Sequence, residues 1–154
     1  MDVNLINPIL IAFSEILPQI GFQTIEKKNV SLVGATLDYD GALINISVIG
    51  AIKGAILIGM DLDSAKRFAS KMMMGIDVPD FDTIAQSAIS EMGNMVCANA
   101  CTQYSKTGIT GLDISPPMLM IGRRGQVTLP VSKTIVVHML ADNIDVQVYI
   151  GLVQ

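Results

Sequence analysis

A helical segment followed by several consecutive strand-like segments occurs twice in this chain, and this order constrains the fold more than any other feature of the sequence. Strands that follow one another without intervening helices favour an α+β fold over a parallel sheet. The repetition indicates a diverged internal duplication. We therefore predict two layers with pseudo-two-fold symmetry, in which long helices cover a mainly antiparallel sheet of about six strands.

In the first half, Asn7-Pro8 has the pattern of an N-cap followed by proline, so we predict a helix from there to about Ile20. The strand-like residues after it are interpreted as a three-stranded antiparallel meander. Its parts are a strand at Asn29–Leu37, a turn at Asp38–Gly41, a strand at Leu43–Val48, a turn at Gly50–Gly54 and a strand at Ala55–Met60.

The second half begins with two further helices. We predict one at Ser64–Met74, capped by Asp61 or Asp63, and after the loop Gly75–Asp82 a long one at Thr83–Lys106. Three strands follow, at Met118–Ile121, Lys133–Leu140 and Ile144–Leu152, and Asp142-Asn143 joins the last two. In Ile144–Ile150 apolar residues alternate with polar ones, which is typical of a half-buried strand.

Composition narrows the class of protein. The 154 residues are 51% hydrophobic and 16% charged, which indicates a globular chain, and we expect one domain over residues 1–154. The net charge of −4 argues against binding nucleic acid or an anionic membrane surface. No apolar run reaches roughly 18 residues without a charge or a turn breaker, so no membrane span is expected. The acidic N-terminus is unlike a signal peptide, so we expect a cytoplasmic protein.

Cysteine and histidine are too few for a metal centre of the usual kind. Cys97 and Cys101 lie four residues apart in one predicted helix, a poor arrangement for a relaxed disulfide, so we expect reduced thiols. His138 is the only histidine. We therefore predict no metal ligands in this chain.

The long predicted helix carries the candidate functional residues. At about 100° per residue, we expect Ile84, Ala88, Met92, Met95 and Val96 to form its core face. Ser87, Glu91 and Asn94 then cluster on the solvent side. Gly93 lies between the last two, and we expect that a partner can approach closely there. Polar residues on the outer face of a helix are often only solvated, but Asn in mid-helix is less usual, because Asn prefers caps and turns. Asn99 falls near the core face, where a hydrogen-bonded role is expected.

These residues also form a known pattern. Ser87, Glu91, Asn94 and Pro117 fit the spacing Asp/Ser-x3-Glu-x2-Asn-x22-Pro, which resembles the signature of the CheC/CheX/FliY phosphatases of bacterial chemotaxis. The opening Asn7-Pro8, the turn Gly50–Gly54 and the single copy of the motif resemble the CheX type. The likeness extends over essentially the whole chain, and it implies a CheC-like fold.

Members of the CheC type carry the motif on two pseudo-symmetric helices. In the first predicted helix, Glu15 keeps the glutamate position, but Ile11 replaces the Asp/Ser and Pro18 replaces the asparagine. We therefore predict that this first site is inactive and that each subunit has one working site.

The resemblance implies a substrate and roles. The substrate is the aspartyl-phosphate of a CheY-like receiver domain, which supplies its own Mg²⁺, so the phosphatase needs no cofactor. Asn94 is implied to position the attacking water, and Glu91 to form a salt bridge with the receiver's active-site lysine. Ser87 adds a peripheral contact and Pro117 shapes the loop after the helix. Proteins of the CheX type are homodimers, which we adopt as the expectation.

Two other functions compete with the phosphatase. A non-catalytic module of the same fold would bind a receiver domain or a flagellar or chemotaxis partner without hydrolysis, and the intact Asn94 argues against it. A stand-alone hydrolase or metal enzyme needs a cluster of ligands or nucleophiles that the sequence does not suggest. Neither nucleic acid nor membrane is an expected partner.

Overall fold

Aspartate side chains begin each α-helix that the structure describes within residues 2–154. The computed structural model places α1 at Val3–Ile16, α2 at Leu62–Met72 and α3 at Thr83–Lys106. Asp2, Asp61 and Asp82 each accept a hydrogen bond from a backbone N–H in the first turn, at 2.9, 2.7 and 3.0 Å. Such caps satisfy donors that the helix itself leaves unpaired. The bounds of α3 agree with the sequence-based prediction.

The predicted start of the first helix was wrong. Asn7 is not the N-cap, because the helix already begins at Val3, and Pro8 lies inside it. Leu5 and Ile6 are buried in the main core together with Ile9 and Phe13. Their burial outweighs the cost of an internal proline, about 3 kcal/mol. After Ile16 the chain tightens into a 3-10 turn, η1 (Leu17–Ile20), and Gly21 ends it with a φ of 112°.

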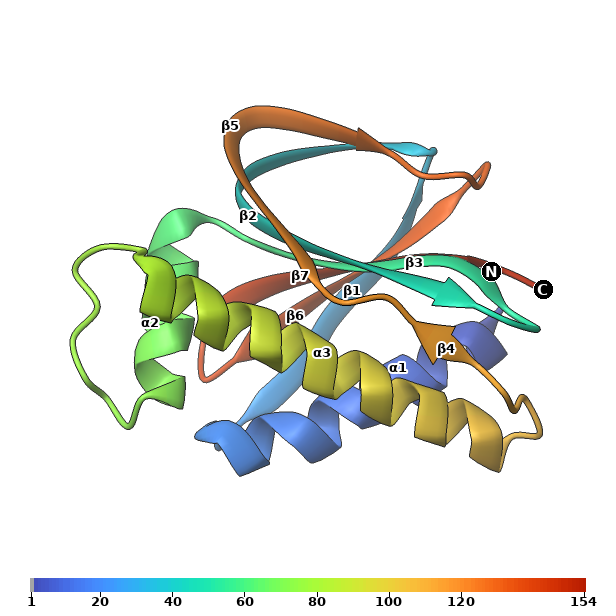
Figure 1. Ribbon diagram of the computed structural model, residues 1–154, viewed down its shortest axis with the longest axis horizontal. Coiled ribbons are helices and arrows are strands. Elements are labelled where there is room, and N and C mark those ends of the chain that lie inside the picture. Colours follow the sequence, from blue (N-terminus) through green and yellow to red (C-terminus); the bar gives the residue numbers. More distant parts are fainter. Residues whose placement is uncertain (1) are drawn as a thin grey trace.

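Residues 25–153 supply seven strands that form one antiparallel sheet (Figure 1). About six strands were predicted from the sequence. The strands are β1 (Ile25–Val33), β2 (Thr36–Ile49), β3 (Lys53–Met60), β4 (Asp113–Ile114), β5 (Met118–Thr128), β6 (Thr134–Ala141) and β7 (Ile144–Val153). Their order is β1-β6-β7-β3-β2, and β2 then pairs with both β4 and β5. The predicted α+β class and antiparallel sheet are confirmed.

The predicted meander was wrong in one respect. β2 and β3 form the expected hairpin, but β1 pairs with β6 from the other half of the chain. In the same way, β5 leaves its own half and pairs with β2. The strand order is therefore symmetric about the central β3–β7 pair, as the predicted duplication requires. In each half, the outer strand, β1 or β5, pairs with a strand of the other half.

The predicted turn at Asp38–Gly41 is instead an irregularity within β2. The strand continues through these residues, and its register with β5 shifts between Tyr39 and Gly41. Gly41 has a φ of 122°, and a Cβ there would lie 2.5 Å from the carbonyl oxygen of Met60. Glycine therefore allows a bulge where a side chain would collide with the end of β3. Turn-forming residues here bend the strand and do not end it.

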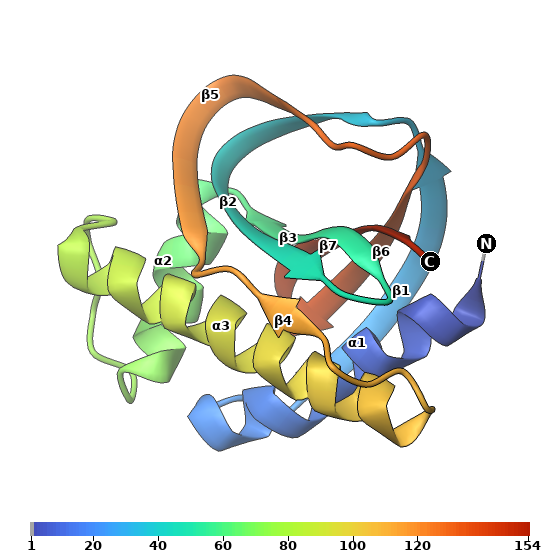
Figure 2. The same ribbon diagram turned by 45° about the vertical axis from the view of Figure 1, so that its right-hand side comes forward.

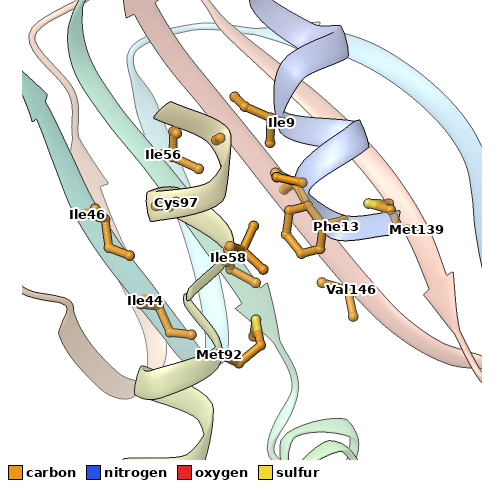
Figure 3. Close-up of a cluster of buried hydrophobic side chains, with 14 of the residues drawn as sticks. Ile9, Phe13, Ile44, Ile46, Ile56, Ile58, Met92, Cys97, Met139 and Val146 are labelled. Carbon is orange, nitrogen blue, oxygen red and sulfur yellow. The ribbon is translucent and has the colours of Figure 1, made fainter. Parts of the chain in front are cut away.

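The three α-helices cover one face of the sheet, whereas β2 and β5 arch away from them (Figures 1 and 2). Alternation along β2 sends Ile44, Ile46 and Val48 into the main core beneath α1 and α3. Figure 3 shows Met92 and Cys97 of α3 and Phe13 of α1 in the main core together with Ile58 of β3. The opposite face of the arch holds a smaller cluster, made of Leu37, Leu43, Ala55, Leu57, Leu129 and Val131.

Both cysteines are free thiols, as predicted. Cys97 is buried, and burial raises the pKa of its thiol to about 12. Cys101 is half-buried, and burial likewise raises its pKa. Neither thiol is therefore a ready nucleophile near neutral pH.

One segment, Val3–Ile20, is long and apolar enough to span a membrane by length and composition alone. It contains one charged residue, Glu15, and two prolines, Pro8 and Pro18. In the fold, α1 packs against α3 and buries seven of its residues. The apolar character of α1 is therefore accounted for by its contacts within the protein.

The β6–β7 hairpin is fastened to the rest of the molecule by Asp142. Asp142 and Asn143, the predicted turn, have φ values of 46° and 64°. One carboxylate oxygen of Asp142 accepts from the backbone N–H groups of Gln23 and Thr24 at 3.0 and 2.7 Å. The other lies 2.9 Å from the ammonium of Lys71 on α2. Lys71 and these backbone donors hold the pKa of Asp142 well below its usual range.

We expect Asp142→Asn to lower the free energy of unfolding by about 2 kcal/mol at pH 7, because hydrogen bonds to a charged group are strong. The native pKa is depressed, so the stabilisation is full above the unfolded-state pKa of about 4, decreases progressively below it, and is lost only when the pH passes below the native pKa. Urea unfolding at pH 7 and pH 3 measures this. The gap between wild type and variant should be smaller at pH 3 than at pH 7, whereas Asp40→Asn, at an exposed site, should open no gap at either pH.

Candidate functional site

The outer face of α3 carries the three motif residues of the helix. Ser87 and Glu91 are exposed and Asn94 is half-buried. The opposite face holds the helix against the sheet through residues that are at most 1% exposed: Ala85, Ile89, Met92, Val96, Cys97, Ala100 and Tyr104. Because that face is fixed, the motif residues project from a rigid support.

The predicted core face of α3 was displaced by about one residue. Met92 and Val96 are buried as expected, but Ile84 is 67% exposed and Ala88 and Met95 are only half-buried. The buried stripe instead runs through Ala85, Ile89 and Gly93. This stripe contains small residues because α3 packs closely on the sheet. The size and hydropathy of the side chains therefore indicated the wrong centre for the buried face of the helix.

Gly93 faces the sheet and not the solvent, contrary to the expectation that a partner approaches there. A Cβ at this position would lie 3.0 Å from Cγ2 of Ile44 on β2. The missing side chain therefore lets α3 come close to β2. This contact fixes the height of Asn94, the next residue, above the sheet. Asn99 is half-buried and its Oδ1 accepts a hydrogen bond from Gln103 at 3.0 Å, as its expected position near the core suggested.

A short loop, Ser115–Pro117, forms the second wall of the site. Ser115 is bound to β2 twice, since its Oγ accepts from the N–H of Ser47 at 2.9 Å and its N–H donates to the carbonyl of Ser47 at 3.0 Å. Pro116 and Pro117 have no N–H, so they make no ladder bonds between β4 and β5. β5 pairs with β2 again from Met118 onward. The loop is thus held firmly beside α3.

Helix and loop together line a shallow open groove of about 500 Å³. Its lining residues are Ser87, Ser90, Glu91, Asn94, Ile114, Ser115, Pro116 and Pro117. The four residues predicted from the motif therefore lie together. Ser90 was not predicted, and its place three residues after Ser87 and four before Asn94 on the same helix was the available signal. Ile114, Ser115 and Pro116 were not predicted as site residues either, although they directly precede Pro117.

The side chains of Glu91 and Asn94 are available to bind a partner. Among residues 2–154, neither Glu91 nor Asn94 has a side-chain hydrogen bond or an ion pair with another described residue. Glu91 is the one charged side chain among those that line the groove. A carboxylate can accept from a cationic group, and a carboxamide can both donate and accept. Within the same residues, no group of three or more His, Cys, Asp or Glu side chains forms a possible metal site.

The counterpart of the site on α1 is built differently. Glu15, at the glutamate position, accepts a hydrogen bond from Nε2 of Gln103 on α3 at 2.9 Å. Pro18, at the asparagine position, lies in the 3-10 turn after the helix, and Ile11 is exposed. The carboxylate of this copy therefore contacts the protein's own helix, which supports the prediction that this copy is inactive.

Comparison with solved structures defines the class of fold. A CheC-like superfamily protein from Shewanella sp. PV-4 has a TM-score of 0.86 at 18% identity, over 100% of both chains. A CheX in complex with CheY, BeF3 and Mg²⁺ from Borrelia burgdorferi has a TM-score of 0.76 at 23% identity, over 97% of both chains. The protein therefore has the CheC-like fold, with a single intact Glu-x2-Asn motif on α3.

Sequence comparison defines the family. The family model for the chemotaxis phosphatase CheX matches residues 42–140, which are more than half of the chain. The CheY-P phosphatase CheX of Thermotoga maritima is 32% identical over 78 residues, which are 51% of this chain and 50% of that protein. The aligned part thus spans about half the length of this curated relative. The chain belongs to the CheX family.

Proposed function

We propose that this protein is a phosphatase that hydrolyses the aspartyl-phosphate of a CheY-like receiver domain in chemotaxis signalling. The observation that carries this proposal is the groove on α3, in which an unpaired carboxylate, Glu91, and an unpaired carboxamide, Asn94, lie beside the Pro117 loop. Family membership supports it, as does the CheY complex formed by the Borrelia burgdorferi structural relative. The proposal takes residues 1–154 as one such domain.

In the proposed reaction, water attacks the phosphorus of the acyl phosphate and the bond from phosphorus to the aspartate oxygen breaks. The products are inorganic phosphate and a free receiver carboxylate. An acyl phosphate already has a good leaving group, so catalysis consists mainly of positioning the water in line with that bond. The Asn94 carboxamide can accept from the water through its oxygen and donate through its NH₂ group. A carboxylate there would repel the phosphoryl charge.

Glu91 is proposed to hold the partner. Its carboxylate is exposed on the same face as Asn94, and a lysine of the receiver's phosphorylation site would form an ion pair with it. Ser87, about one helical turn before Glu91, adds a peripheral contact. Pro117 keeps the loop at a fixed distance from the helix. Mg²⁺ belongs to the receiver in this proposal, and this chain contributes no cofactor.

We also propose that the protein acts in the cytoplasm as a homodimer. The outer edge of β1 has no strand beside it within the described sheet, and such an edge is a ready template for pairing between two copies. Light scattering coupled to size exclusion measures the mass directly.

The test is the decay of phosphorylated receiver domains from the same organism. Each receiver is phosphorylated with acetyl phosphate in the presence of Mg²⁺, freed of the donor, and followed with and without this protein. We expect at least one receiver to lose its phosphoryl group faster in its presence. If none does, while one binds, the non-catalytic module is the better account. If none binds either, a receiver domain is not the partner.

A further inference from the structure

An exposed isoleucine extends the motif face of α3 toward the N-terminus of the helix. Ile84 is 67% exposed and lies seven residues before Glu91. Seven residues turn a helix by almost two full turns, so both side chains leave the axis in directions about 20° apart. Single exposed apolar residues are common on protein surfaces, so exposure alone does not assign a role. The role of Ile84 is indicated instead by its position on the same side of α3 as Glu91.

The size of a protein interface decides whether Ile84 lies inside it. A specific interface buries about 800 Å² on each partner, which corresponds to a disc of roughly 16 Å radius. Ile84 lies about 10 Å from Glu91 along the helix axis, at 1.5 Å per residue. A domain centred on the pair Glu91 and Asn94 therefore covers Ile84 unless it docks entirely toward the other end of α3.

A second exposed aliphatic side chain lies on the side of the sheet that the helices cover. Ile121 on β5 is 46% exposed. Leu119, two residues earlier, packs against the main core, and side chains two apart on a strand share a face. Ile121 therefore leaves the sheet on the side of the helices, and the first part of β5 lies near α3. The polar groove therefore has exposed aliphatic side chains on α3 itself and on β5, the strand that follows the loop.

We infer that Ile84, with Ile121 as a second contact, is the apolar anchor on which the receiver domain docks, so that the receiver carries an aliphatic or aromatic side chain about 10 Å from the lysine that binds Glu91. This inference rests on the proposed function. Glu91 and Asn94 set which group is recognised and hydrolysed, whereas burial of Ile84 supplies binding free energy that does not depend on the phosphoryl group.

The test compares Ile84→Thr with Val3→Thr. Val3 is a matched control, since it is a β-branched residue near a helix start and is 60% exposed. Val3 is in α1 and lies near the C-terminal end of α3, far from Ile84. This follows because the carbonyl of Leu5, two residues after Val3, accepts a hydrogen bond from the hydroxyl of Tyr104 near that end of α3. Tyr104 is thirteen residues beyond Glu91, or about 20 Å along the axis. Both substitutions keep a β-branched side chain, and both sites are exposed, so folding should be unaffected.

The measured quantities are the dissociation constant for a receiver charged with beryllofluoride and Mg²⁺, and kcat and KM for phosphorylated receiver. For Ile84→Thr we expect both the dissociation constant and KM to rise about tenfold, which corresponds to 1.4 kcal/mol, with kcat within twofold of wild type. Val3→Thr should match wild type in every constant.

Different failures are distinguishable. If Ile84→Thr binds and turns over like wild type while Asn94→Ala is inactive, the anchor is wrong and the phosphatase stands. If Ile84→Thr lowers kcat at unchanged KM, Ile84 is not an anchor, because it then affects the reaction step. If wild type neither binds nor dephosphorylates any receiver, both the proposed function and the anchor are wrong.

Discussion

Asn94→Ala is expected to lower the dephosphorylation rate constant by at least about 100-fold while the receiver still binds, because misplacing the attacking water by about 1 Å costs a factor of this order. The carboxamide has no other partner among residues 2–154, so its loss removes no internal hydrogen bond. The side chain is half-buried at the edge of the groove, and alanine fits a helix well. A loss of activity would therefore report the reaction and not the fold.

Two variants sharpen this experiment. Asn94→Asp has the same shape but brings a negative charge toward the phosphoryl group and loses both N–H donors, so it should be as inactive as Asn94→Ala. Asn99→Ala removes an asparagine from the same helix that contacts Gln103 and does not line the groove, so kcat should stay near that of wild type. Single-turnover decay of phosphorylated receiver and affinity for its beryllofluoride form separate chemistry from binding. An active Asn94→Ala would contradict the role given to this residue.

The parts of the fold that the sequence predicted correctly are those that local chemistry decides. The start of α3 at Thr83 was predicted, as was the tight turn Asp142-Asn143 between β6 and β7, and the structure adds Asp82 as the N-cap. The partner of β1 was missed because pairing with β6 joins residues more than a hundred positions apart, and no local pattern encodes that choice. The Asp38–Gly41 segment has turn-forming residues, yet pairing with β5 keeps it in β2, while pairing with β3 begins only at Ala42.

The candidate site was predictable in composition but not in shape. The motif spacing gave Ser87, Glu91, Asn94 and Pro117, and the structure places them around one groove. The closeness of α3 to β2 at Gly93 was not predictable, because it depends on a contact with Ile44 across the core. The exposure of Ile84 was missed for a related reason. The predicted core face included Ile84 and Ala88, whereas the buried stripe runs one residue later, through Ala85 and Ile89.

The largest effect on binding is expected at Glu91. Its carboxylate is exposed, lies in the groove and has no ion-pair partner among the described residues, so it is available for a lysine of the receiver. Removing one member of a charge pair that becomes buried in a complex costs about 2–5 kcal/mol, mostly because the other charge is left unpaired. Glu91→Ala should therefore weaken receiver binding by roughly 30-fold or more and should lower turnover as well.

Glu91→Gln and Asp63→Asn provide the comparison. Glu91→Gln keeps the size and the acceptor oxygen but not the charge, so it should lose most of the affinity if the ion pair is the main contribution. Asp63 is an exposed acid on α2 that pairs with Arg67, and its neutralisation changes the net charge by the same amount without touching the groove. Affinity measured from low to high salt should fall for wild type and Asp63→Asn, and should change much less for Glu91→Gln. Equal affinities for all three proteins at low salt would show that Glu91 does not hold the receiver.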